Sequence, residues 1–357
     1  MLKGWINNVG EEDGFNDTWQ IVEDAARYSF NASHSLSVAI DALYGAYLKA
    51  NYPIEYMTVA LNLYSGDEER TNNLVKECDY FNISIKNPIF RKSKGEYFFD
   101  KETNSIYKGI GSIKYMNNAV GDELYELKDN KYNSFVELLK DIKSTSCNSR
   151  QLDILIKIGF FNEFGSIKKL LEVVEVFNTY YSKKTISKDK MALLGLDHIN
   201  LNKYATDRSE KTGKEQKTWK LLDVVGLINE LSLSITDEEY DITQLLQWQN
   251  EILGYIGYTN SKLDKRYAFV QKIDGIKGTR KVNLYCLNNG KTSDFKVNGR
   301  LFSSKPFKEG DIIYTTSCSK KYKAIPVEKD ENNKVTKWGK DMNTIEWWLD
   351  DYNNKLN

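Results

Sequence analysis

The chain has 357 residues, enough for two or three domains that each bury a core. Its 50 lysines and arginines are balanced by 50 aspartates and glutamates, which excludes a global basic field, so any affinity for nucleic acid must come from local surfaces. No stretch approaches the roughly 18 apolar residues of a membrane helix, and the four cysteines are scattered singly, without zinc-site or disulfide spacing, so we expect no membrane contact and a reduced, cytoplasmic setting.

The N-terminal part contains apolar residues at helical spacing. Residues 1–27 predict two short helices separated by a glycine-bounded acidic turn at Gly10 to Gly14. A compact polar loop from Asn31 to Ser35 then leads directly into an apolar segment with a helical period. Ser33 or Ser35 is a candidate N-cap for that helix. The first amides of the helix and His34 would lie together at its start, where an anion can bind.

Several short motifs here resemble a known family. They are Phe30-Asn31, Ser33-His34, Leu48-Lys49-Ala50, Tyr52-Pro53 and Glu55-Tyr56-Met57. This pattern resembles the fingers region of the family C replicative DNA polymerases, the alpha subunits of bacterial DNA polymerase III.

The resemblance implies that this loop handles nucleotide. It assigns contacts with the triphosphate or the primer terminus to Asn31, Ser33, His34 and Lys49. Two positive charges of the family are missing, because Ala32 stands where a lysine is expected and Asn51 where a histidine often sits. The alternative is that His34 only caps its own helix.

The rest of the first domain predicts a helix and a short strand. Leu74, Val75 and Cys78 mark the helix, residues 81–85 alternate as a strand does, and Asn87-Pro88 ends that strand. We expect a fingers-like helical domain over residues 1–104.

Residues 105–180 are similar to the tandem helix-hairpin-helix region that follows the fingers in the family. Such a hairpin binds duplex DNA without sequence choice, because glycine lets the backbone approach a phosphate. In the first half, residues 106–128, the family's Gly-Val-Gly is replaced by Tyr115-Met116-Asn117. The candidate contacts with the DNA backbone are Lys114, Asn117 and Asn118, and a plain helical turn is an equal alternative.

The second half, residues 148–177, keeps more of the pattern. Gly159 ends one apolar helix, and Gly165-Ser166 begins the next. Lys168 and Lys169 lie in the first turn of that helix, where basic side chains oppose the helix dipole unless an anion lies among them. We expect Gly165, Ser166 and the two lysines to bind DNA, the alternative being a solvated lysine pair.

Residues 181–220 predict a linker. At this place the family carries a sliding-clamp peptide, and Met191, Leu193 and Leu194 resemble its apolar anchors. The alternative is a hydrophobic tether that packs on its own domain. Residues 205–220 are polar and mixed in charge, which indicates an exposed loop. Two helices, near 221–233 and 242–252, form a helical connector over residues 221–262.

The last segment changes to the period of strands. Strands are expected at residues 267–273, 281–287 and 312–316, and their spacing favours a small barrel over residues 263–330. It resembles the OB-fold of the family, which implies that Lys272, Lys277 and Arg280 contact single-stranded template. On the alternative reading the barrel aromatics are core and the lysines face solvent. Residues 331–357 predict a C-terminal helix docked on the barrel.

The predicted fold class is therefore α+β and multidomain: a mostly helical fingers and helix-hairpin-helix region followed by a small OB-like β-barrel. Nucleotidyl transfer needs carboxylates that hold two metal ions, and no strand-borne Asp-x-Asp pair is present, so we predict no catalytic or metal-binding residue. The resemblance implies a palm domain that holds Mg²⁺.

The leading hypothesis is the C-terminal portion of a family C DNA polymerase that binds DNA and incoming nucleotide with a separate palm polypeptide and is inactive alone. The alternatives are a non-enzymatic DNA- or sliding-clamp-binding regulator and an inert remnant.

Overall fold

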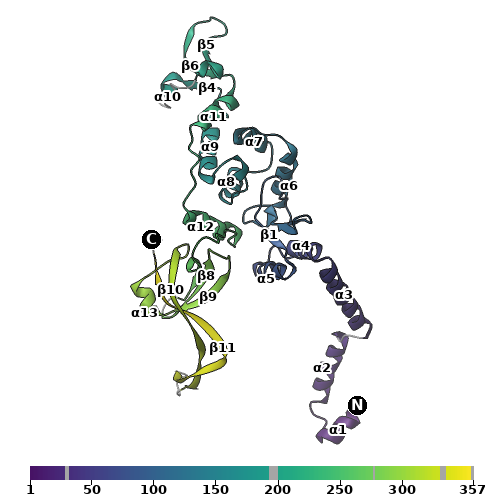
Figure 1. Cartoon of the computed structure of the whole chain (residues 1–357). Helices are drawn as coiled ribbons and strands as arrows, with labels where there is room; N and C mark the ends of the chain where they lie inside the picture. Colours follow the sequence, from purple (N-terminus) through teal and green to yellow (C-terminus); the bar gives the residue numbers. More distant parts are fainter. Residues whose placement is uncertain (29–31, 193–199, 276–277, 330–334, 355–357) are drawn as a thin grey trace.

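The structure, a computed structural model, describes residues 1–28, 32–192, 200–275, 278–329 and 335–354. The chain runs from three N-terminal helices through a helical body to a C-terminal barrel (Figure 1). The α+β class predicted from the sequence is confirmed.

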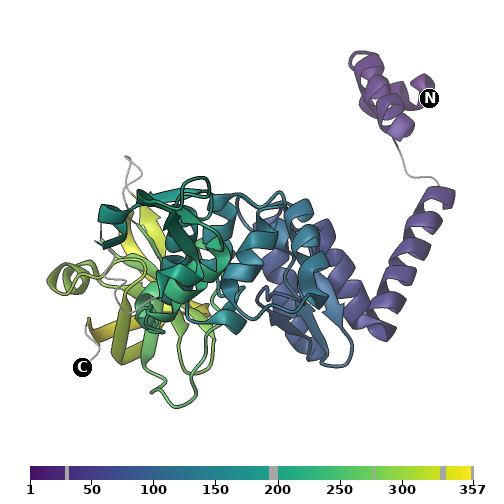
Figure 2. The same cartoon turned by 90° about the horizontal axis from the view of Figure 1, so that it is seen from above.

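The first three helices form an arm that reaches away from the rest of the molecule (Figures 1 and 2). They are α1 (Leu2–Val9), α2 (Phe15–Tyr28) and α3 (Ala32–Asn51), so the two short helices expected over residues 1–27 are confirmed. The predicted capping of α3 is wrong. The helix begins at Ala32, which places Ser33 and Ser35 inside its first two turns.

A small core follows the arm. Helix α4 (Pro53–Leu63) has Pro53 in its first turn, where the missing N–H costs no hydrogen bond, and α5 (Glu68–Cys78) is capped by Asp67. Both pack on a three-stranded sheet with the order β1-β3-β2 (Ser84–Lys86, Ser105–Tyr107, Phe98–Asp100). The strand predicted at 81–85 begins at Ser84 instead, because residues 79–81 form the 3-10 turn η1. The buried side chains are those of Ile54, Met57, Leu61, Cys78, Ile83, Tyr97 and Ile106.

Four helices with asparagine or serine N-caps make the central body. They are α6 (Asn118–Glu126), α7 (Phe135–Ile142), α8 (Ser149–Lys157) and α9 (Ile167–Tyr180). The 3-10 turn η2 (Ile110–Ser112) precedes α6, and η3 (Leu127–Asp129) and η4 (Asn162–Phe164) precede α7 and α9. Their N-caps are Asn117, Ser134, Asn148 and Ser166. Their apolar faces share one continuous core, which includes Leu124, Leu138, Leu155, Phe161 and Phe177.

The prediction of a linker over residues 181–220 is wrong. This segment forms a second three-stranded sheet of β4 (Thr185–Ser187), β6 (Glu215–Leu221) and β5 (Ala205–Arg208), with α10 (Lys188–Ala192) and η6 (Leu201–Lys203) beside it. The charged composition concealed the strands because their charges are paired with one another. Lys188, the first residue of α10, pairs with Asp207 of β5 and Glu215 of β6, and Lys220 of β6 pairs with Glu210.

The connector helices are confirmed as α11 (Val224–Leu233) and α12 (Ile242–Leu253). Buried Lys108 donates a hydrogen bond of 2.8 Å to the carbonyl of Leu253. This contact joins the C-terminal end of α12 to the segment that precedes the first hairpin.

Five strands then close into a barrel in the order β10-β11-β9-β8-β7. They are β7 (Tyr267–Asp274), β8 (Arg280–Cys286), β9 (Thr292–Val297), β10 (Ile312–Lys329) and β11 (Val335–Asn353), and α13 (Gly299–Ser304) lies between β9 and β10. The three predicted strands are confirmed. Residues 335–353 are a strand, however, so the predicted C-terminal helix is wrong.

The error at the C-terminus has a physical reason. A short apolar run such as Trp347-Trp348-Leu349 does not distinguish a helical period from a strand period. What decides the outcome is the long strand β10, which offers its backbone groups to β11 from Tyr314 to Lys329. Leu349 and Tyr352 then fill the barrel core.

Candidate nucleic-acid interface

The first hairpin is built on backbone-to-backbone packing of glycines. The N–H of Gly111 donates to the carbonyl of Gly95 at 2.8 Å, and the N–H of Gly95 donates to Oδ1 of Asp122 at 2.9 Å. A methyl group on Gly121 would lie 2.6 Å from the Cα of Gly95. Only glycine fits this approach, which holds α6 against the segment before it.

Tyr115 lies at the tip of this hairpin in the left-handed region, with φ of 69°. This is the first of the three positions where the resemblance expects Gly-Val-Gly, so the glycine conformation is kept although the residue is not glycine. Nε2 of Gln151 donates to the carbonyl of Tyr115 at 3.2 Å and helps to hold it. A tyrosine at positive φ costs about 1–3 kcal/mol.

The ring of Tyr115 lies close to two cations. It is 52% exposed, and Nζ of Lys114 and Cζ of Arg150 lie 5.2 Å and 3.6 Å from its centroid. The neighbouring Lys114, and then Arg150, lower the pKa of the Tyr115 hydroxyl. The hairpin tip is therefore a basic and aromatic surface, to which the sequence analysis contributed Lys114 only.

The two asparagines predicted to touch DNA here have local roles. Oδ1 of Asn117 accepts the N–H of Val120 at 3.0 Å and caps α6. Asn118 packs against Gly111, where a Cβ would lie 1.7 Å from its Oδ1.

The second hairpin brings all four of its predicted residues together, and an acidic segment of the same chain lies on them. This segment is residues 237–239. The N–H of Ser166 donates to Oδ1 of Asp237 at 2.8 Å, and the N–H of Ile167 donates to Oε2 of Glu239 at 3.2 Å. The first amides of α9 therefore bind carboxylates, as a helix N-terminus is suited to do.

Both lysines of the second hairpin join this contact. Nζ of Lys168 lies 3.0 Å from Glu238 and Nζ of Lys169 lies 3.5 Å from Asp237, while Gly165, with φ of 142°, precedes the capping serine. Hydrogen bonds from Ser166 are the main cause of the lowered pKa of Asp237, and Glu238 raises the pKa of Lys168. Both lysines are thus paired with carboxylates of the same chain.

The residues predicted to bind nucleotide do not form one site. Ser33 and His34 lie exposed at the start of α3, whereas Lys49 lies near its end, about 22 Å away at 1.5 Å per residue. Lys49 pairs with Glu77 and lies 5.8 Å from the ring of Tyr56. Asn31 lies outside the described residues.

Of the predicted clamp anchors, Met191 is buried in the core of its own domain, as the tether alternative expects. Leu193 and Leu194 lie outside the described residues.

The barrel residues divide between core and surface. Phe269 is fully buried, so for this residue the core alternative is right. Lys272 lies 3.5 Å from Asp274, and Lys277 lies outside the described residues. The guanidinium of Arg280 lies 5.3 Å from the ring centroid of Phe302, with Nη1 buried and without an acceptor among the described residues.

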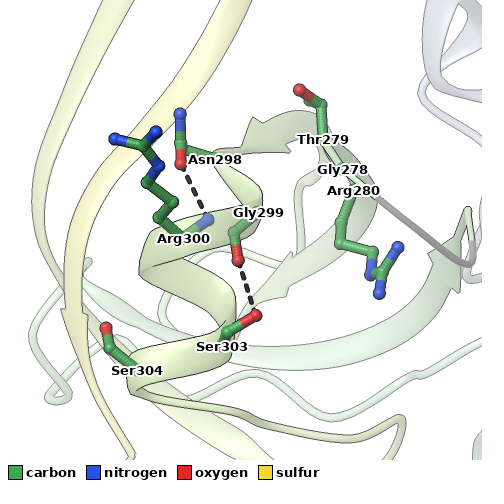
Figure 3. Close-up of a pocket in the computed structure, with 8 residues that line it drawn as sticks. All are labelled: Gly278, Thr279, Arg280, Asn298, Gly299, Arg300, Ser303 and Ser304. Atoms are coloured by element: carbon green, nitrogen blue, oxygen red, sulfur yellow. Dashed lines mark hydrogen bonds between the residues drawn. The ribbon is translucent and has the colours of Figure 1, made fainter.

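Arg280 also lines an open hollow at one end of the barrel (Figure 3). The hollow lies between residues 278–280 and α13, and Figure 3 shows the side chains of Arg280 and Arg300 extending in different directions from it. Asn298 caps α13 by accepting the N–H of Arg300 at 2.8 Å. Because the two guanidinium groups extend in different directions, the hollow does not present both charges to a single anion.

Two kinds of feature are absent from the described residues. No group of three or more His, Cys, Asp and Glu side chains is placed to hold a metal ion, and no helix is long and apolar enough to cross a membrane.

Comparison with known proteins agrees with the hairpin geometry. Residues 82–171 match the family model of the helix-hairpin-helix motif. DNA polymerase III subunit alpha of Campylobacter jejuni is 29% identical over 307 residues, which cover 83% of this chain and 24% of that protein. This chain is a relative of DNA polymerase III subunit alpha.

Two further alpha subunits extend the comparison. The subunit of Treponema pallidum is 25% identical over 74% of this chain and 23% of its own length, and that of Mycobacterium tuberculosis is 30% identical over 44% of this chain and 13% of its own length. The chain thus spans about a quarter or less of these DNA polymerase III alpha subunits. The relationship supports a DNA-binding role connected with a polymerase.

Sequence reasoning missed two features of possible function. The acidic segment 237–239 gave a signal, three consecutive carboxylates, but no indication that α9 lies beside it. The pairing of β10 with β11 was missed because residues 331–357 were predicted to be helical.

Proposed function

We propose that this chain forms the fingers, hairpin and barrel portion of a family C DNA polymerase, binding primer-template DNA and incoming nucleotide beside a palm polypeptide. The observation that carries the proposal is the start of α9, in the region that matches the helix-hairpin-helix model. There two backbone amides and two lysines already bind carboxylates, and a DNA phosphate has the same charge and acceptor chemistry.

The N-terminal arm carries an exposed apolar surface that could contact the palm polypeptide of this proposal. Helix α3 exposes apolar side chains around its surface: Leu36, Val38, Ile40, Leu43, Tyr44, Tyr47 and Leu48. Contiguous exposed apolar surface marks a site of protein association. In the relatives' family the fingers adjoin the palm, so a palm is the partner we propose for α3. The Mg²⁺ of such a palm is not assigned to any residue of this chain.

Primer extension tests the catalytic part of the proposal. The purified chain is mixed with a candidate palm polypeptide, and extension is compared with that of the palm alone. We expect synthesis only with both, and loss of the gain after Leu43→Asp, which places a charge on α3 without disturbing a core. No gain from adding the chain would contradict the proposal.

DNA binding is tested separately by fluorescence anisotropy with a primer-template at increasing salt. We expect tight binding at low salt that weakens steeply as salt rises, because phosphate contacts release counterions. Absence of binding at low salt would contradict the DNA-binding part of the proposal, whatever the result of primer extension.

The second candidate function is a DNA- or clamp-binding regulator, favoured by the carboxylates that lie on α9. A pull-down with a sliding clamp tests its clamp form. Retention that is lost after Leu193→Ala and Leu194→Ala would support it, and absence of retention would exclude it.

A further inference from the structure

A short segment between β1 and β2, residues 89–95, contacts both hairpins. Near its start, the N–H of Phe90 donates at 2.9 Å to the carbonyl of Phe160, which lies in the loop of the second hairpin. At its end, the N–H of Gly95 donates at 2.9 Å to Oδ1 of Asp122, which lies in α6 of the first hairpin. We call residues 89–95 the strap. Because this one segment is bonded to both hairpins, it can fix how they lie relative to each other.

The strap contains a closed turn with a strained residue inside it. Oγ of Ser93 accepts the N–H of Ile89 at 3.0 Å, and the N–H of Ser93 donates to the carbonyl of Ile89 at 3.0 Å. Ser93 is buried. Arg91 lies within this turn in the left-handed region, with φ of 72°. Residues other than glycine seldom adopt this conformation, and such strain is maintained only where surrounding contacts impose it.

The side chain of Arg91 also reaches both hairpins. Its Nε donates to the two carboxylate oxygens of Glu163, at 2.8 Å and 3.1 Å, and Glu163 lies in η4 within the loop of the second hairpin. Its Nη1 donates to the carbonyl of Lys128 and, at 2.9 Å, to that of Asn130, and both residues follow α6 of the first hairpin. One guanidinium therefore links a carboxylate of the second hairpin to backbone carbonyls beside the first.

Aromatic rings lie beside the same guanidinium. Its Cζ lies 4.9 Å from the centroid of the Phe90 ring and 5.9 Å from that of the Tyr132 ring. The Phe90 ring in turn contacts three rings of the second hairpin, those of Phe160, Phe161 and Phe164. Arg91 is therefore placed to hold groups of its own chain rather than to bind a phosphate.

We propose that Arg91 is a positioning residue that fixes the two hairpins relative to each other, so that both bind one DNA duplex at the same time. Two sites in a fixed relation act as a bivalent site, because the second contact forms at a high effective concentration once the first is made. The inference rests on the proposed function, in which the hairpins contact duplex DNA. It adds that they act as one unit and names the residue that joins them.

The dependence of affinity on duplex length tests this role. Fluorescence anisotropy is measured with the full chain and labelled DNA stem-loops of constant loop and increasing stem length, the shortest of which reaches one hairpin only. For wild type we expect a steep rise in affinity at the stem length that reaches the second hairpin. Arg91→Lys keeps the charge but not the planar fork. It should lower long-stem affinity on the order of ten-fold and leave short-stem affinity unchanged.

Further variants separate the link from other effects. Arg91→Gly should have the same effect as Arg91→Lys, and its backbone favours the positive φ, so it serves if the lysine variant does not fold. Adding Glu163→Gln to Arg91→Lys should lower the ratio of long-stem to short-stem affinity no further, because both changes break one link. Arg70→Lys is the matched control. Arg70 also combines a carboxylate, Asp67 at 3.3 Å, with a ring, Tyr64 at 4.8 Å, but lies in α5 outside the hairpins.

Each outcome decides the inference, once circular dichroism has shown that a variant keeps the fold. A steep rise equal to that of wild type in both Arg91 variants would overturn it. An equal loss of affinity at every stem length would overturn it too, because Arg91 would then contact DNA directly or support the fold as a whole. A wild-type chain whose affinity rises only gradually would overturn the inference and leave the proposed function standing, whereas one that binds no stem-loop would overturn both.

Discussion

The backbone N–H of Ser166 donates a hydrogen bond of 2.8 Å to Oδ1 of Asp237, although 71 residues separate them in the chain. The contact places an internal carboxylate where a hairpin of this kind binds a phosphate. On the proposed function, DNA and residues 237–239 would compete for the same amides and lysines, so the internal carboxylates would lower the affinity for DNA.

Removal of the internal carboxylates should strengthen duplex binding. The double variant Asp237→Asn, Glu238→Gln replaces two side-chain carboxylates by uncharged side-chain amides of the same shape. We therefore expect it to bind duplex DNA several-fold more tightly at low salt. Glu175→Gln is the matched control, because it removes one exposed charge from the same helix α9 away from its start. Anisotropy with a labelled duplex measures the effect. Equal affinities for the double variant and the control would contradict competition.

The same contact predicts a pH dependence of stability. The pKa of Asp237 is lowered in the folded chain, chiefly by the hydrogen bonds from Ser166. Its stabilisation is therefore complete above the unfolded aspartate pKa, near ~3.9, and is lost as pH falls through the lower folded value. Thermal melts should show that wild type loses more stability than Asp237→Asn as pH falls below about 4. Equal losses of stability in wild type and Asp237→Asn would contradict the hydrogen bonds from Ser166 to Asp237.

Gly121→Ala should destabilise the first hairpin. The added methyl would lie 2.6 Å from the Cα of Gly95, which is backbone and cannot rotate away. We expect a loss of about 1–3 kcal/mol or more in the free energy of unfolding, measured by urea denaturation. Gly45→Ala is the matched control within α3. It meets nothing within 4 Å and should gain stability by up to about 1 kcal/mol.

Tyr115 should tolerate glycine better than a β-branched residue. Because its φ is 69°, Tyr115→Val should lose about 1–2 kcal/mol of stability, whereas Tyr115→Gly relieves the strained backbone and should lose little. Both variants lack the ring that lies beside Arg150, so lost ring contacts are common to the two. Urea denaturation of the pair measures the backbone effect. A larger loss in the glycine variant would assign the cost to the ring instead.

Much of the helical part could be predicted from local signals. The second hairpin could be predicted because glycine, serine and asparagine stand at its helix ends. Asn148, Gly159 and Ser166 begin or end helices through backbone groups only a few residues away. The α+β class, with a helical region before the strands of the barrel, was also predicted correctly.

The errors arose where a distant segment decides the outcome. β6 is a strand because it pairs with β4 and β5, and β11 is a strand because it pairs with β10. The spacing of apolar residues within a short segment does not show such pairings. For the same reason the sequence left Lys168 and Lys169 open between an anion site and a solvated pair, and it did not show that residues 237–239 pair with them.

The parallel pair of β9 and β11 has a consequence for the order of assembly. Lys296 and Val297 pair with Trp348 and Leu349, so this pairing can form only after α13, β10 and most of β11 have been synthesised. Leu349 and Tyr352 also belong to the barrel core. A nascent chain released before residue 348 would carry an open sheet with two unpaired edges. The barrel therefore closes only when β11, its last strand, has been added.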